Sequence, residues 1–456
     1  MAVNFVRRGS KGASRDWRRL AGHFGNIGHL LSGNVLSNVL AMGSLAIAAR
    51  TLSTVEFGTL VMVVTYVRLV ERLIRFESWQ PLIHFAANLS LDASVKLSRL
   101  YLFGLLLDAA AAIFATATAI GFAWFFGPLV AISDSAITLI AIYASGILFN
   151  ITGVPTASLR MAGRFRSIAY VQPVAQLVRL PLAGLCALFR ADLQSFVLAW
   201  LAAQIVGSSL FFFLGWRALA AQSIPNPLKS SPRGLMREFP GFASFAWSSN
   251  LSMTLRTVTQ EADVLLVGLF AGAPSAGFYH VAKRLAKIAQ QVGGQTQAVL
   301  YPDMARLWAA ARFAELRSLT RRLQIILFAI GASAVVAAAL VGELLVNAIL
   351  GHRYSHVGLL LVVQLLAVTF IMHGAPSRSV LLSMGKPSVV LRSSVLGAVV
   401  FFSAAALLIP RFGALGAAYS QIGLAAISAL WMDIAWARNI GRKIREAADI
   451  SGDRED

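Results

Sequence analysis

The stretch AARTLSTVEFGTLVMVVTYVRLVERLIRF, residues 48–76, decides how this chain can fold. Most of it is apolar enough to cross a membrane. Four charged residues nevertheless lie on or beside the lower half of the same helix: Arg68, Glu71, Arg72 and Arg75. A charge at the centre of a lipid-facing helix costs about 2.5–3.5 kcal/mol. These side chains must therefore face protein or water inside a bundle of helices.

The composition of the whole chain supports a membrane protein. The 456 residues are 57% hydrophobic and 13% charged, whereas soluble domains contain about 45–50% and about 25% of these classes. The net charge of +20 belongs to residues that lie mostly between apolar segments, and no basic domain stands apart. This distribution argues against nucleic-acid binding. Because Cys186 is the one cysteine, an intramolecular disulfide and a cysteine-based zinc site are excluded.

Twelve segments satisfy the criterion of about 20 mostly apolar residues for a membrane span. The first six are 28–50, 57–76, 100–123, 135–158, 168–189 and 195–216. The second six are 241–269, 275–299, 324–349, 356–376, 388–409 and 414–437. We therefore predict an all-α polytopic membrane protein with two six-helix lobes.

The boundaries of these lobes follow from the segments between spans. Residues 1–27 form a basic tail, and 28–216 form the amino-terminal lobe. Residues 217–240 contain prolines and serines typical of a linker. The carboxyl-terminal lobe then covers 241–437, and a second tail covers 438–456.

The distribution of positive charge predicts the orientation. With the amino terminus in the cytoplasm, 30 of the 40 Lys and Arg residues lie in cytoplasmic segments, and 4 lie in outer loops. Positive residues concentrate on the cytoplasmic side of membrane proteins. We therefore expect both termini in the cytoplasm. The outer loops are too short to hold a separate catalytic domain.

The two halves show a weak internal repeat. Gly58 opens a helix beside Phe57, and Gly277 opens one beside Phe278. Aligning the two glycines places Arg68 on Lys287, as a parallel repeat of six spans would. Chance similarity between two apolar segments remains an alternative.

The second span carries the first candidate substrate-binding residues. Arg68, Arg72 and Arg75 share one helix face, and Glu71 flanks it. Arg68 lies about 17 Å from Phe57 at 1.5 Å per residue, which places it in the middle of the membrane. Arg75 can extend its charge to the cytoplasmic surface, and Arg72 is compatible with either role.

The seventh span is polar in its middle. Arg256, Gln260 and Asp263 repeat the same spacing, and Glu261 lies beside that face. Arg256 and Gln260 are candidate substrate-binding residues, and Glu261 and Asp263 are candidates for ion coupling. A structural ion pair between Arg256 and Asp263 is the alternative.

The eighth span opens with further cations. Lys283, Arg284 and Lys287 precede Gln291, and a helix this polar must line water or pack inside the bundle. All four are candidate substrate-binding residues, as is Arg179 in the fifth span. A surface-lying amphipathic helix is the alternative, but it would invert every later loop.

Other polar residues indicate structural roles. Asp108, Glu343 and Asp433 are single acids near span ends or small-residue interfaces. His352 and His356 have ligand-like spacing but no third ligand nearby, so we expect no metal site. The chain lacks nucleotide-binding, metalloprotease and serine-hydrolase motifs, so we expect neither catalysis nor a cofactor.

Two six-span halves, the basic tail, the run AARTLSTVEFGTL and the segment RFESWQPLIHF, residues 75–85, resemble a known transporter family. They are similar to the Wzx-like O-antigen and exopolysaccharide flippases, often called lipopolysaccharide biosynthesis proteins, of the multidrug/oligosaccharidyl-lipid/polysaccharide (MOP) exporter superfamily. The resemblance implies a V-shaped bundle of the type found in MATE transporters. It also implies cavity cations on the first, second, seventh and eighth spans, although the first span here has only Asn34, Asn38 and Arg50.

The resemblance further implies a function. Such proteins move an undecaprenyl-diphosphate-linked glycan from the inner to the outer leaflet of the bacterial inner membrane by alternating access. Membrane lipids would be partners, with the polysaccharide polymerase and chain-length machinery as candidates. A MATE-like antiporter of small cations and an integral-membrane polymerase or ligase are alternatives. The first would need a more acidic cavity, and the second a large outer loop.

Overall fold

The computed structural model describes residues 32–75, 78–87, 89, 94–127 and 134–452. Over these residues the chain is helical, with turns and short 3-10 segments between helices and no strand. The prediction of an all-α membrane protein is confirmed. The chain divides into two compact units. Unit 1 holds the residues up to Thr51 and Tyr66–Leu255, and unit 2 holds Leu52–Thr65 and Arg256–Asp456.

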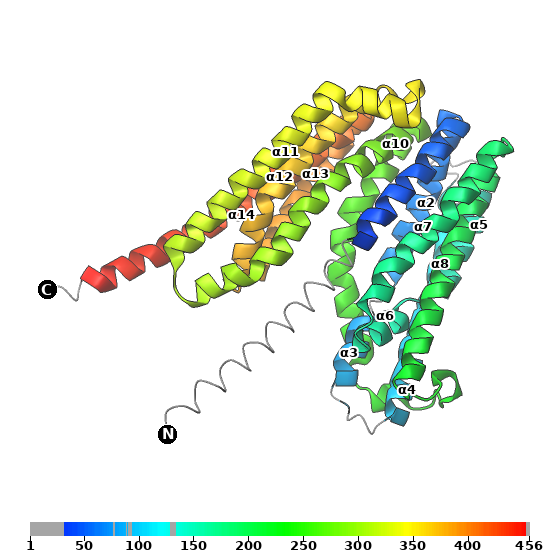
Figure 1. Ribbon diagram of the computed structural model, residues 1–456, viewed down its shortest axis with the longest axis horizontal. Helices are drawn as coiled ribbons and strands as arrows, with labels where there is room; N and C mark the ends of the chain where they lie inside the picture. Colours follow the sequence, from blue (N-terminus) through cyan, green and yellow to red (C-terminus); the bar gives the residue numbers. More distant parts are fainter. Residues whose placement is uncertain (1–31, 76–77, 88, 90–93, 128–133, 453–456) are drawn as a thin grey trace, which may run out of the picture. The chain divides into compact units, whose positions relative to one another are not determined.

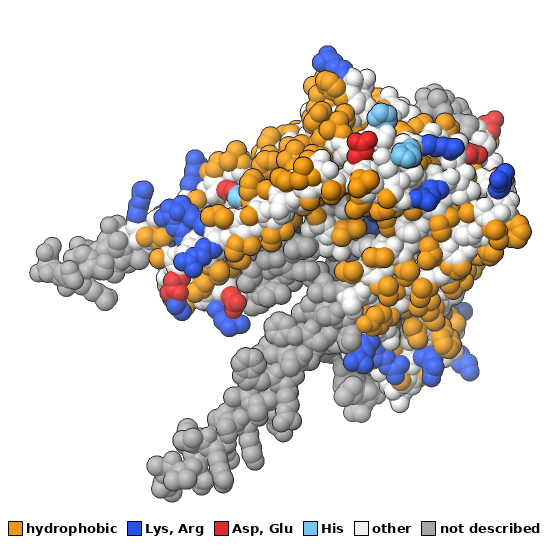
Figure 2. Space-filling model, turned by 45° about the horizontal axis from the view of Figure 1, so that its top comes forward, with side chains coloured by type: hydrophobic (Ala, Val, Ile, Leu, Met, Phe, Trp, Pro, Cys, Tyr) orange, Lys and Arg blue, Asp and Glu red, His pale blue; other side chains and the backbone are white. Residues whose placement is uncertain are grey.

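Ten helical segments of the described chain are long and apolar enough to cross a membrane, and each overlaps a predicted span. Of the two other predicted spans, 57–76 carries several charges, and 241–269 has side chains that are described only in part. Large apolar side chains are exposed on these helices, and that of Leu340 reaches 79%. Figure 2 shows hydrophobic side chains over much of the visible face, with groups of Lys and Arg side chains toward its edges. This pattern suits a lipid-facing surface.

Unit 1 contains most of the amino-terminal half (Figure 1). After the first helix, Ser32–Thr51, and the second part of α2 (Thr54–Ile74), its α-helices are α3 (Trp79–Ala87), α4 (Ser94–Phe126), α5 (Asp134–Ala144), α6 (Gly153–Met161), α7 (Phe165–Leu188), α8 (Leu193–Ala221) and α9 (Leu235–Glu238). Two 3-10 segments are η2 (Ser145–Phe149) and η3 (Pro227–Lys229). The fourth predicted span therefore consists of α5, η2 and α6.

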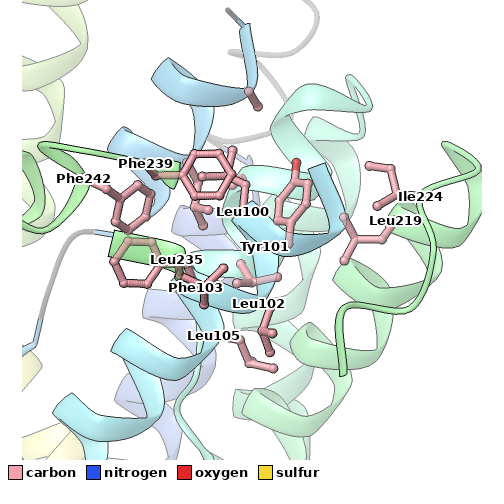
Figure 3. Packing of buried hydrophobic residues seen from close by; sticks show 14 residues of the cluster. Leu100, Tyr101, Leu102, Phe103, Leu105, Leu219, Ile224, Leu235, Phe239 and Phe242 are labelled. Atoms are coloured by element: carbon pink, nitrogen blue, oxygen red, sulfur yellow. The ribbon is translucent and has the colours of Figure 1, made fainter. Parts of the chain in front are cut away.

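The segment predicted as a linker, residues 217–240, packs within unit 1. Leu235 and Phe239 join a buried cluster with aromatic and leucine side chains of α4 and with Phe242 (Figure 3). Arg99 of α4 donates to Glu238 at 2.6 Å and to the carbonyl oxygen of Arg233 at 2.8 Å. Apolar burial and this ion pair therefore hold the segment against α4.

Unit 2 contains the long carboxyl-terminal helices. They are α10 (Phe242–Ala309) from Arg256 onward, α11 (Phe313–Leu350), α12 (Val357–Ser383), α13 (Pro387–Phe412) and α14 (Ala414–Gly452), with η4 (His352–Tyr354) before α12. Figure 1 shows α11 to α14 side by side. At 68 residues, α10 would extend about 100 Å if straight. The non-helical φ of 83° at Gly272 divides it into two parts, each long enough to cross a bilayer core of about 30 Å.

The start of α2 has a clear local cause. Ser53 and Glu56 form a reciprocal capping box, in which the Ser53 N–H donates to Glu56 at 2.9 Å and the Glu56 N–H donates to Ser53 Oγ at 3.2 Å. One turn further, Gly58 lies against α10. A Cβ added to Gly58 would lie 1.9 Å from the carbonyl oxygen of Ala273. Only glycine permits this approach of two backbones.

Candidate functional site

The charged face of α2 meets the break in the fourth span. Glu71 is buried, with 6% of its surface exposed. It accepts hydrogen bonds from the Asn150 amide and, at 3.4 Å, from Arg75. Ser208 of α8 donates to the side-chain oxygen Oδ1 of Asn150 at 3.3 Å. Glu71 therefore ties α2 to α8 through the non-helical residue Asn150.

A second carboxylate of unit 1 holds the other side of the same break. Asp108 of α4 accepts the Gly153 N–H at 3.0 Å. The first N–H groups of a helix have no partner within it, and the residue before α6, Thr152, makes no side-chain cap. Asp108 supplies this cap from a neighbouring helix, where the helix dipole favours an anion. Asp108 and Glu71 both line one small pocket beside alanines of α4.

The predicted cations of unit 1 lie in different environments. Arg68 is half-buried and Arg72 is exposed. The Arg75 side chain is 31% exposed beside Glu71. Arg179 of α7 is buried, at 5% exposure, with its guanidinium 4.9 Å from the centre of the Trp200 ring of α8. The protein shields Arg179 from lipid by a cation–π contact.

Asp263 is the centre of a polar network in unit 2. Its carboxylate is fully buried and forms an ion pair with Lys283, with the Nζ–Oδ1 distance at 2.7 Å. Tyr279 donates to the carboxylate at 2.8 Å and Gln421 of α14 at 2.9 Å. Tyr279 and Lys283 are one turn apart, beyond the kink of α10, and Asp263 lies before it. The network therefore connects both parts of α10 with α14.

The remaining predicted residues lie along α10. Glu261, Arg284 and Gln291 are half-buried and Lys287 is exposed. The side chains of Arg256 and Gln260 fall outside the described part of the chain. Within that part, no group of three or more His, Cys, Asp and Glu side chains could hold a metal ion.

A third polar group joins three helices of unit 2. Asp433 of α14 accepts from His373 of α12 at 2.9 Å and from Gln324 of α11 at 2.8 Å. Ser377 and Trp436 donate to the same carboxylate. The sequence analysis named Asp433 only as a structural acid and did not name His373 or Gln324. A polar residue inside an apolar span is the signal that could have found them.

Comparisons with known proteins find relatives in sequence and in fold. The Escherichia coli (strain K12) inner membrane protein YghQ is 25% identical over 283 residues, which cover 62% of this chain and 80% of that protein. An inward-facing MATE multidrug resistance transporter of the MOP superfamily has a TM-score of 0.70 at 12% identity, over 90% of this chain and 95% of the other. The lipid II flippase MurJ, in an inward closed conformation, has a TM-score of 0.70 at 13% identity, over 89% and 87%.

The helical architecture and these likenesses define the class: a multi-pass membrane protein with the MOP fold. Residues 47–359 match the family described as polysaccharide biosynthesis protein. This match covers more than half of the chain. The chain belongs to that family, and the predicted resemblance is confirmed.

Proposed function

We propose that this protein moves an undecaprenyl-diphosphate-linked glycan from the cytoplasmic to the outer leaflet of the bacterial inner membrane by alternating access. The observation that carries the proposal is the presence of basic side chains on helices of a polysaccharide biosynthesis family member: Arg68 on α2, and Lys283, Arg284 and Lys287 in the part of α10 that is long and apolar enough to cross a membrane. A flippase of lipid II has the same fold, and YghQ is named as an inner membrane protein.

The physical basis is recognition of a diphosphate by cations. Lys and Arg form charge-assisted hydrogen bonds with phosphate oxygens, and these are about twice as strong as neutral ones. We include Arg68 of α2 and, from the sequence, Arg256 and Gln260 of α10 among the proposed contributors. Lys283 is also paired with Asp263, so part of its charge is already balanced within the protein.

The membrane potential provides a driving force for an anionic headgroup. An interior-negative potential favours outward movement by about 2.3 kcal/mol per charge per 100 mV. The proposal includes no bond-breaking step and no cofactor, so the protein acts as a transporter rather than an enzyme. The polymerase and chain-length machinery of the same glycan are its proposed partners.

Leaflet transfer in proteoliposomes tests the proposal. A labelled undecaprenyl-diphosphate glycan is reconstituted, and its accessibility to an external modifying reagent is followed with time. Arg68→Ala and Arg256→Ala should each slow transfer roughly ten- to a hundredfold, because a hydrogen bond to a charged group contributes about 1.5–3 kcal/mol. Arg68→Lys should retain part of the rate.

Arg411→Ala is the matched control, since Arg411 is exposed at the end of α13 and lies in an outer loop of the predicted topology. Its transfer rate should equal that of the parent protein. Normal transfer by both Arg68→Ala and Arg256→Ala would show that these basic residues take no part in the mechanism. Transport of a lipophilic cation without transfer of the glycan would show that the protein is a small-molecule exporter rather than a flippase.

A further inference from the structure

His373 and Asp433 form a titratable pair in the core of unit 2. The His373 ring nitrogen Nε2 lies 2.9 Å from Asp433 Oδ2, and the two side chains are 27% and 26% exposed. Since the carboxylate can only accept, Nε2 carries the hydrogen and Nδ1 has the free electron pair. Nδ1 is buried and has no hydrogen-bond partner in the described chain. The pair thus has one unused site for a proton.

The charges around the pair do not balance it. Among the described residues, the other donors to Asp433 are Gln324, Ser377 and Trp436, all of which are neutral. His373 also meets the edge of the Phe328 ring, with centroids 5.9 Å apart. With neutral histidine, the group therefore carries one negative charge in a membrane-crossing bundle.

The helices packed around the pair also carry cations. Arg321 and Arg322 on α11, Arg392 on α13 and Arg438 on α14 are exposed, and Arg378 on α12 and Lys386 before α13 are half-buried. In the described part of the chain, His373 is the one ion-pair partner of Asp433. Addition of one proton to the imidazole makes the pair neutral overall.

The Asp263 network shows the contrast. There, Lys283 balances the buried carboxylate permanently. Protonation of Asp263 would leave Lys283 as an uncompensated charge, which is strongly unfavourable inside a protein. The Asp433 carboxylate has a histidine in that position, and histidine is the side chain that changes charge near neutral pH.

The chemistry of the group favours a proton over a metal cation. Sodium requires several oxygen ligands, whereas Asp433 is surrounded by N–H and O–H donors that already point at its oxygens. A cation at the carboxylate would have to displace these donors. A proton at Nδ1 displaces none.

We infer that His373 and Asp433 form a proton-binding site through which translocation is coupled to a proton gradient; this inference rests on the proposed function. One proton from water forms an N–H bond at Nδ1, giving imidazolium beside ionised Asp433, and the same bond breaks when the proton returns to water. Because α11, α12 and α14 all contribute to the group, a movement among them alters access to Nδ1. Proton entry is thereby coupled to export of the lipid-linked glycan.

Proteoliposomes with an imposed pH difference test this site. The steady-state distribution of labelled lipid-linked glycan between leaflets is measured with and without a difference of about one pH unit, in sodium-free buffer. Coupling of one proton per lipid shifts the leaflet ratio about tenfold per pH unit. His373→Gln keeps a donor to Asp433 but cannot bind the proton, so its leaflet ratio should not respond to the pH difference. Asp433→Asn should give the same loss.

His356→Gln is the control, because His356 is exposed at the start of α12. It should retain the tenfold shift of the parent protein. An undiminished shift in His373→Gln or Asp433→Asn would overturn the inference, as would a parent protein that transfers the lipid without any response to pH. In that last case the proposed function stands. Absence of transfer in the parent protein at every pH would overturn the proposed function itself. Thermal denaturation verifies that each variant is folded. If His373→Gln does not fold, the response of Asp433→Asn to the pH difference tests the inference alone.

Discussion

At the scale of single residues, charges inside the helices are stabilised in three ways. Asp263 has a full ion pair with Lys283. Glu71 accepts a hydrogen bond from the Asn150 amide and forms an ion pair with the partly exposed Arg75. Asp433 relies on neutral donors and a histidine. These differences decide which charge is structural and which can change.

The ion pair on α10 gives a stability prediction. Asp263→Ala should lower the unfolding temperature markedly, because loss of one partner of a buried pair costs about 3–5 kcal/mol. Adding Lys283→Met should recover part of this loss, since it removes the uncompensated charge. Thermal denaturation of both single variants and the double variant in detergent measures the coupling. Additive effects would show that the two residues are energetically independent.

The break in the fourth span gives a second prediction. A Cβ on Gly153 would lie 1.7 Å from Ser78 Oγ and 2.4 Å from Asp108 Oδ2. Gly153→Ala should therefore disrupt the cap of α6 and destabilise the protein by roughly 1–3 kcal/mol. Gly121→Ala on α4 is the control, because its Cβ has no atom within 4 Å. There, alanine should be neutral or stabilising by about 0.5–1 kcal/mol.

At the scale of elements, α2 belongs to both units. Its first part, up to Thr65, packs in unit 2, and the rest packs in unit 1. Phe57 and Phe278 both contact the buried ring of Tyr354 edge-on, with centroids 5.7 Å and 5.4 Å away. The two glycines of the predicted repeat, Gly58 and Gly277, lie directly against each other. The start of α2 is therefore held by backbone contact and aromatic packing.

This contact predicts a strong effect of a single methyl group. Gly58→Ala should push α2 from α10, because the added Cβ meets a backbone oxygen that cannot rotate away. We expect a lower unfolding temperature and slower glycan transfer. Gly184→Ala on α7 has open space at its Cβ and should change neither. Equal unfolding temperatures and transfer rates of the two variants would show that the close contact between α2 and α10 is not needed for stability or transfer.

At the scale of the whole molecule, the charge distribution predicts the topology. The twelve predicted spans, with 30 Lys and Arg residues on one side and 4 on the other, predict both termini in the cytoplasm. A carboxyl-terminal fusion should fluoresce as green fluorescent protein and be inactive as alkaline phosphatase. Fusions after Arg190 and Arg353 should give the reverse. An active phosphatase at the carboxyl terminus would require an odd number of spans.

Much of the candidate site could be anticipated from local sequence. Arg68, Asp263 and Lys283 are visible because a charge in an apolar segment is unfavourable in lipid. The partners of these charged residues could not be predicted in this way. Gln421 is 158 residues from Asp263, and Asn150 is 79 residues from Glu71. No spacing rule within one helix connects residues so far apart.

The sequence by itself determined the fold class, because long apolar segments satisfy their backbone hydrogen bonds in lipid by forming helices. It also determined the charge asymmetry between alternate loops. The start of α2 at Thr54 also has a local cause, the Ser53–Glu56 capping box, although the predicted span began at residue 57. Only the tertiary structure decided which charges are balanced. The energy of a buried charge depends on the groups that surround it, so Lys283 beside Asp263 and His373 beside Asp433 have different roles although both lie in apolar helices.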